Sequence, residues 1–196
     1  MAIIEKKIVS LYLFKNKAMK ERDYFKQFDI HFGNFSFGKH CLDLEINNTF
    51  FEKHDNEDIT GAKISVRLEI ERKETLVILC FGISGTLYST CDLCLEEISI
   101  PVAKDEKLIL KIVPQPYESD DENIVFISEH TYSYNVEQIL FEYLCTLIPM
   151  RKVHGEIGTE TCNQNMLALI ENAKVKPVQQ EDARWEALKN IKLEDN

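Results

Sequence analysis

Two cysteines separated by two residues carry the clearest chemical signal in this sequence. In the run Cys91-Asp92-Leu93-Cys94, both thiolates can turn back onto one tetrahedral ion while the intervening backbone amides support the sulfurs. One such pair is half of a zinc site. The other half is predicted from His154 and Cys162, whose spacing of eight residues is looser than the usual knuckle of about two to four.

The same cysteine pair has two competing interpretations. A redox dithiol would need a strand that leads into the pair at a helix N-terminus, where the helix dipole lowers the thiol pKa. Here a strand is predicted after the pair, over residues 96–102, and Glu96 and Glu97 disfavour a thiolate. The third interpretation is that the two thiols merely share a loop. Spacing alone leaves all three open.

Other catalytic constellations are missing from the sequence. It has no GxGxxG, GxxxxGK[ST], GxSxG or HExxH motif, and its five histidines are scattered. Paired carboxylates occur only in runs that are predicted to be exposed. The cysteine pair is therefore the one candidate for chemistry that the motifs of this sequence offer.

Composition narrows the class of protein further. Among 196 residues, 44% are hydrophobic and only seven are glycine and five proline, which excludes collagen-like and wholly disordered chains. No stretch approaches the roughly 20 apolar residues of a membrane span. The formal net charge of -10 disfavours binding to nucleic acid, DNA included, unless basic residues gather on one face.

Cysteine usage and the N-terminus predict a reducing cytoplasm. Six cysteines are too few for a disulfide scaffold of this size. The short apolar run over residues 8–14 is followed directly by lysines and lacks a small-residue cleavage site, so it does not match a secretory signal.

Periodicity predicts an α+β fold: a twisted antiparallel sheet or partial barrel, packed by one main helix, with a helical C-terminal tail. An alternating opening segment (Phe28, Ile30, Phe32) precedes further alternating strands. The run 76–81 is apolar at odd and even positions alike. It therefore predicts a central strand with both faces covered, which ends at a bend near Gly82 and Gly85. The remaining predicted elements are strands over 42–46, 64–70, 98–102 and 108–112, an exposed loop over 114–123, and helices over 50–54, 136–148 and 164–171.

Three segments are predicted along the chain. Residues 1–18 are either an overlong start, with Met19 as the true first residue, or a short native N-terminal element. Residues 19–172 form a single α+β domain with the zinc site. Residues 173–196 are a linker and a last helix from Asp182, whose Trp185 and Leu188 share a face that must be buried against the chain's own sheet or a partner.

The order of these features resembles the YceD family, the bacterial large ribosomal RNA subunit accumulation proteins. The resemblance spans about Tyr24 to Ile191. It rests on an ordered set: the Tyr/Phe-rich opening strand, Gly38-Lys39-His40, Phe50-Phe51-Glu52, the CxxCLE of Cys91 to Glu96, Leu147-Ile148-Pro149, and Asp182 to Lys189.

The resemblance implies a cytoplasmic, non-enzymatic protein that supports synthesis, processing or stability of the large-subunit (23S) ribosomal RNA. The implied partners are ribosome-assembly proteins or pre-ribosomal particles, with no membrane. The alternative functions are an acidic protein–protein adaptor unrelated to RNA and a CxxC dithiol redox protein. Many relatives add a second cysteine cluster where His154 and Cys162 stand here, which favours zinc bound by Cys91, Cys94, His154 and Cys162.

Two departures from the family pattern bear on function. Leu93 stands where the usual CxRC has arginine, and Ala183 stands where a proline usually precedes Arg-Trp. Direct RNA contact stays open. Its candidates, which are also ordinary solvated cations, are Arg151, Lys152, Lys174, Lys176, Arg184, Lys189 and Lys192.

Overall fold

The computed structural model describes residues 23–54, 56, 58–158 and 160–174. Contacts divide the chain into two compact units, one up to Cys162 and one from Asn163 onward. The predicted N-terminal segment 1–18 and the predicted last helix with Trp185 lie outside the described residues, and the predicted three-segment division stays a prediction.

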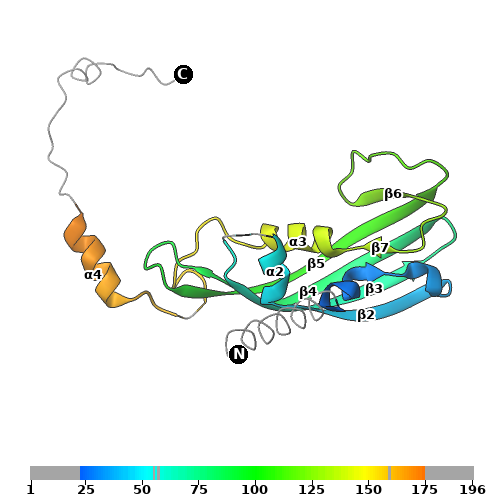
Figure 1. Ribbon diagram of the computed structural model, residues 1–196. Coiled ribbons are helices and arrows are strands. Elements are labelled where there is room, and N and C mark those ends of the chain that lie inside the picture. The colour runs from blue at the N-terminus through cyan, green and yellow to red at the C-terminus, as the bar shows by residue number, and fades with distance from the viewer. Residues whose placement is uncertain (1–22, 55, 57, 159, 175–196) are drawn as a thin grey trace, which may run out of the picture. The chain divides into compact units, whose positions relative to one another are not determined.

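The first unit is built on a five-stranded sheet, which confirms the predicted α+β class (Figure 1). Its strands, in spatial order, are β2 (Gly38–Ile46), β3 (Gly61–Arg72), β4 (Leu76–Thr90), β5 (Glu97–Val113) and β6 (Ile124–Ser128). Neighbours from β2 to β5 are antiparallel, whereas β6 runs parallel to β5. The sheet is therefore mixed and open rather than wholly antiparallel or closed into a barrel.

The central hairpin of β4 and β5 is longer than predicted. The predicted bend at Gly82 and Gly85 does not end β4, which continues to Thr90, and the two strands predicted over 98–112 are one strand. Gly85 has a φ of 149°, and a Cβ there would lie 2.2 Å from the carbonyl oxygen of Lys63. This glycine thus permits close approach of β3 instead of stopping β4.

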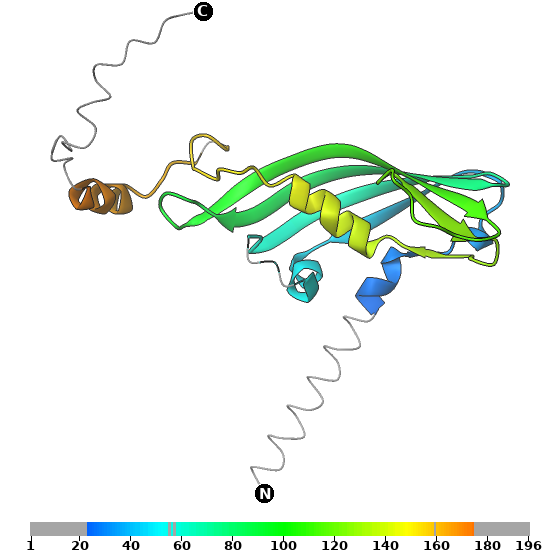
Figure 2. The same cartoon turned by 90° about the horizontal axis from the view of Figure 1, so that it is seen from above.

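One face of the sheet carries the core. Side chains alternate along the strands, so that Val66, Leu68, Leu79, Leu108 and Leu110 are wholly buried on this face while their neighbours point the other way. Two helices cover it, α2 (Asn48–His54) and α3 (Glu137–Thr146) (Figure 2). The core therefore lies between the sheet and these helices.

Helix α3 is the predicted main helix, with shorter bounds. Its N-cap is Val136 rather than Asn135, although the Asn135 side-chain oxygen accepts a hydrogen bond from the amide of Glu137 at 2.8 Å. Asn135 and Gln138 have the three-residue spacing of a capping box, but that box is not formed, because the Gln138 side chain donates forward to Glu142 at 2.9 Å. On the sheet side, the ring of Tyr143 packs edge-on against Phe81.

The opening segment is not the predicted strand. It forms two 3-10 turns, η1 (Lys26–Phe28) and η2 (Phe32–Asn34), around the two-residue strand β1 (Asp29–Ile30), which pairs with β7 (Tyr134–Asn135). The three alternating apolar residues are all buried: Phe28, Ile30 and Phe32. Their alternation therefore reflects burial and not a long strand paired to the sheet.

The second unit contains α4 (Gln164–Ala173), in agreement with the predicted helix over 164–171. The Asn163 side chain caps it by accepting the amide of Asn165 at 2.9 Å. Within the described residues, no helix is both long enough and apolar enough to cross a membrane.

Candidate metal centre

The first two candidate ligands lie in the turn that joins β4 to β5. The amide of Cys91 donates to the carbonyl of Glu96 at 2.8 Å, and the amide of Leu95 donates back to the carbonyl of Cys91 at 3.0 Å. Leu95 adopts a φ of 62°, a left-handed conformation that closes the turn. Both Cys91 and Cys94 are buried as a result.

The other two ligands come from the segment after α3. The carbonyl of Val153 accepts amides from Glu156 and Ile157, each at 3.1 Å, and Gly155 has a φ of 85°. This tight turn presents His154, and Cys162 follows at the end of the first unit. Both side chains are buried.

Two backbone segments far apart in sequence are joined beside the ligands. The amide of Asp92 donates to the carbonyl of Lys152 at 2.7 Å, and the amide of Lys152 donates to the Asp92 carboxylate at 2.6 Å. The Lys152 ammonium is in turn 3.0 Å from Asp58. These contacts hold the β4–β5 turn against the turn of His154.

The four predicted ligands converge. One ligand atom from each of Cys91, Cys94, His154 and Cys162 lies within 4.8 Å of the others. The Cys91 and Cys162 sulfurs are 3.8 Å apart, and His154 Nδ1 is 3.3 Å from the Cys94 sulfur and 3.8 Å from that of Cys162. Tetrahedral zinc, with bonds of about 2.3 Å to sulfur and 2.0–2.1 Å to nitrogen, separates two sulfurs by about 3.8 Å and sulfur from nitrogen by about 3.5 Å. The arrangement fits such an ion.

The imidazole of His154 is oriented for ligation through Nδ1. Its Nε2 donates a hydrogen bond to the backbone carbonyl of Glu97 at 3.1 Å and lies 3.5 Å from the Glu160 carboxylate. A proton held on Nε2 leaves the Nδ1 lone pair directed at the sulfurs, which is the arrangement seen around ligating histidines.

The electrostatics of the cluster favour a cation. Burial raises the pKa of the Cys91 thiol, but backbone amides of Cys94, His154 and Leu93 donate to its sulfur and lower the pKa overall, to about 6. Burial and the neighbouring sulfurs raise the pKa of Cys162 to about 11. Negative charges on neighbouring sulfurs would therefore repel one another, and a bound divalent ion would offset that repulsion.

Comparison with known proteins places the chain in a family. A family model described as large ribosomal RNA subunit accumulation protein YceD matches residues 79–192, more than half of the sequence. The chain belongs to the YceD family. No curated protein and no solved structure matches it. The matched region of this YceD protein contains all four converging side chains, and its family is named for accumulation of large-subunit ribosomal RNA.

The described candidates for RNA contact are engaged with carboxylates. Arg151 pairs with Glu156 at 2.9 Å, Lys152 with Asp58 at 3.0 Å, and Lys174 with Glu171 at 2.5 Å. The remaining candidates, Lys176, Arg184, Lys189 and Lys192, lie outside the described residues. No unpaired basic cluster emerges from the three that this YceD structure describes.

Sequence reasoning missed two residues that shape the site. Asp92 was visible only as a residue between two cysteines, yet its carboxylate and amide both hold Lys152. Leu95 carries no signal of a left-handed conformation, since glycine or asparagine usually marks such a position.

Proposed function

We propose that this YceD protein is a non-catalytic ribosome-biogenesis factor that supports synthesis, processing or stability of 23S ribosomal RNA. The observation that carries the proposal is the family match, which covers the converging residues and most of the β4–β5 hairpin. The protein acts in the cytoplasm, with ribosome-assembly proteins or pre-ribosomal particles as its partners.

The proposed metal is a structural zinc ion held by Cys91, Cys94, His154 and Cys162. Four protein ligands complete a tetrahedral shell and leave no position for a reacting water, which distinguishes structural from catalytic zinc sites. All four side chains are buried, so substrate would also lack access. The ion would bind the β4–β5 turn to the segment that follows α3.

Contact with ribosomal particles is proposed to run mainly through protein. The net charge of -10 repels naked RNA, and the described basic candidates are paired. We therefore expect weak binding of the isolated protein to ribosomal RNA at physiological salt. Tight, salt-sensitive binding of purified protein to RNA fragments, together with loss of every cellular partner after nuclease treatment, would contradict this route.

The metal can be tested on protein purified without added zinc. Elemental analysis should find about one zinc per chain, and Cys94→Ser should lose the ion and melt at a lower temperature. Cys41→Ser is the matched control, because Cys41 is exposed on β2 and distant in the sheet from this turn. Metal-free wild-type protein with a disulfide between Cys91 and Cys94 would instead support a redox dithiol.

The cellular role can be tested by deleting the gene and measuring the ratio of 23S to 16S ribosomal RNA. We expect the ratio to fall, and wild type or Cys41→Ser to restore it. Cys94→Ser should restore it poorly, because the proposed ion would be lost. An unchanged ratio in the deletion strain would reject the role irrespective of the metal.

A further inference from the structure

The outer face of the sheet, opposite the core, carries an apolar row at one end. Ile78, Ile109 and Ile124 stand opposite one another on β4, β5 and β6, because Ile78 pairs with Ile109 and Ile109 pairs with Ile124. Paired residues share a face, and the neighbours Val77, Leu108 and Leu110 are buried on the core side. The three isoleucines are half-buried.

The row leads to an aromatic pair at the loop between β5 and β6. Tyr117 stacks on Phe126 with ring centroids 4.0 Å apart and an interplanar angle of 25°. Tyr117 is nevertheless 63% exposed, so its other ring face meets solvent. The Lys111 ammonium lies 5.6 Å from the Phe126 centroid, so the pair already has one cation beside it.

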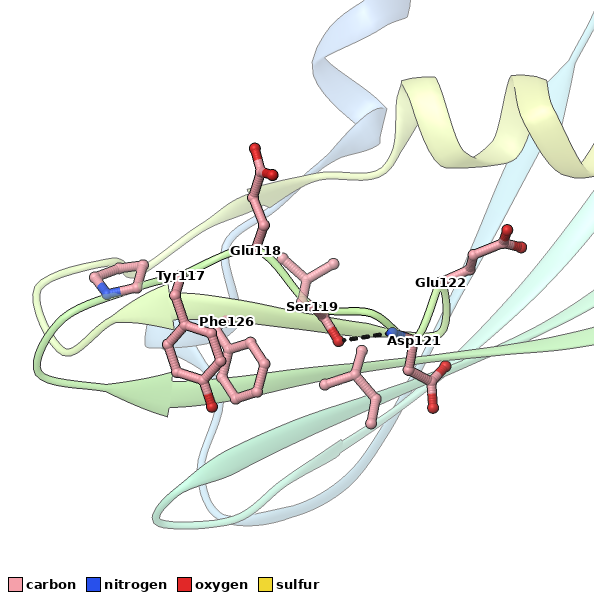
Figure 3. A pocket seen from close by; sticks show the side chains of 9 residues that line it. Tyr117, Glu118, Ser119, Asp121, Glu122 and Phe126 are labelled. Atoms are coloured by element: carbon pink, nitrogen blue, oxygen red, sulfur yellow. Dashed lines mark hydrogen bonds between the residues drawn. The ribbon is translucent and has the colours of Figure 1, made fainter.

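A hollow of about 610 Å³ opens beside this pair (Figure 3). In Figure 3 the rings of Tyr117 and Phe126 and the carboxylate of Asp121 point to one side of the loop, while Glu118 and Glu122 point to the other. One Asp121 oxygen accepts the amide of Asn123 at 2.9 Å, which fixes the side chain in place. The lining thus combines aromatic and aliphatic side chains with three acidic residues, Glu118, Asp121 and Glu122.

We propose that this surface, formed by Ile78, Ile109, Ile124, Tyr117 and Phe126 with Asp121 beside them, docks a protein segment that carries arginine or lysine next to apolar side chains. The isoleucine row would contact the apolar side chains. The open face of Tyr117 would stack on one guanidinium or ammonium, and Asp121, which lies beyond Phe126 in Figure 3, would pair with a second. The inference goes beyond the proposed role in ribosomal RNA accumulation and does not require the metal.

Charge selects the class of partner. The loop residues Glu118, Asp120, Asp121 and Glu122 bring four carboxylates to this end of a chain whose net charge is -10. Lys107 and Lys111 flank Ile109 on the same face of β5, so the four carboxylates of the loop outnumber these two lysines. A phosphate backbone would be repelled here, whereas a basic protein segment would be attracted and its association accelerated.

Labelled peptides provide the probe. We expect a nine-residue peptide of alternating leucine and arginine to bind the full-length protein in fluorescence anisotropy, with affinity that falls as salt rises. A peptide of alternating serine and arginine should bind more weakly, because it lacks the apolar contacts. A leucine and glutamate peptide should not bind.

Substitutions locate the binding. Tyr117→Ser should weaken the leucine and arginine peptide about three- to tenfold, whereas Tyr117→Phe should retain it. Tyr132→Ser is the matched control, because Tyr132 is 66% exposed yet lies outside this hollow. Asp121→Asn keeps the acceptor for Asn123 and should also weaken binding, unlike Glu52→Gln on α2.

Two results would overturn the proposal. The first is equal affinity of Tyr117→Ser and Tyr132→Ser for the peptide, when both variants melt at the wild-type temperature. The second is binding of an oligouridine probe that depends on Tyr117 while the peptides fail to bind, which would assign the surface to nucleic acid.

Discussion

Asp92 and Lys152 exchange two hydrogen bonds, one between their backbones at 2.7 Å and one from the Lys152 amide to the Asp92 carboxylate at 2.6 Å. The ionised acceptor makes the second bond stronger than one between neutral groups. The pair fastens the turn that carries Cys91 and Cys94 to the turn that carries His154. It therefore preorganises the proposed zinc site.

Removing this carboxylate should loosen both turns. We expect Asp92→Ala to lower the free energy of unfolding by about 1–3 kcal/mol, because the Lys152 amide loses its acceptor. Zinc should also dissociate faster into a chelator. Asp92→Asn keeps a neutral acceptor, so its free energy of unfolding should lie between those of wild type and Asp92→Ala. Urea unfolding monitors stability, and a loss no larger than that of Leu93→Ala would show that the pair contributes little.

The left-handed residue in the cysteine turn predicts a stabilising change. Leu95→Gly should raise the free energy of unfolding by about 0.5–1 kcal/mol, because glycine avoids the steric cost at a φ of 62° and outweighs its greater unfolded-state entropy. Leu95 is 68% exposed, so little packing is lost. Leu93→Gly, without a positive φ, should instead destabilise. Denaturant midpoints measured side by side would refute this if Leu95→Gly were the less stable variant.

The two glycines of β4 should respond in opposite ways. Gly85→Ala is expected to cost about 2–3 kcal/mol, because the new Cβ meets the backbone of Lys63 at a φ that L-residues rarely adopt. Gly82→Ala is the control, since its Cβ would be 3.5 Å from Asp105, an ordinary contact, and should change stability by less than about 1 kcal/mol. Thermal melts of both variants would test this. An equal loss of stability in Gly85→Ala and Gly82→Ala would contradict the explanation from backbone contact.

A half-buried histidine, His54, should make stability fall in mild acid. His54 stacks on Phe141 at 4.2 Å, and its burial lowers its pKa, although Glu137 at 3.1 Å opposes this and Lys53 adds to it. The unfolded chain then binds a proton that the native state refuses, so stability is lost as pH falls below the ordinary value of about 6.5.

The comparison of interest is the slope of unfolding free energy against pH between 7.5 and 5, measured by urea titration with about 0.1-unit pH control. His54→Phe should show a shallower decline than wild type. Identical slopes in His54→Phe and wild type would mean that this histidine is not the proton acceptor.

Local patterns predicted the core elements because burial imposes a period on each one. The alternation over 64–70 and the helical repeat before Pro149 are short-range consequences of one buried face. The parallel direction of β6 was not predictable, because it depends on how the loop 114–123 crosses the sheet end. The prediction of a strand in the opening segment was wrong for a related reason. Burial of alternate residues such as Phe28 and Ile30 does not show which strand, if any, forms hydrogen bonds with the segment.

The candidate site likewise has features that the sequence predicted and features that it did not. Residue type and family resemblance predicted its four side chains, and the fold brings them together. The contact of Asp92 with Lys152 joins residues 60 positions apart, so no local pattern encodes it. The stack of Tyr117 on Phe126 was likewise hidden in a loop that composition marked only as acidic and exposed.

The position of Cys162 has a consequence for synthesis of the chain. It lies 71 positions after Cys91, at the end of the first unit. At translation rates of about 5–20 residues per second, roughly 4 to 14 seconds pass between production of these two cysteines. During that interval the proposed zinc shell would lack its fourth ligand. If zinc is what protects these thiols, newly made chains would be most open to oxidation at Cys91 and Cys94 before Cys162 is translated.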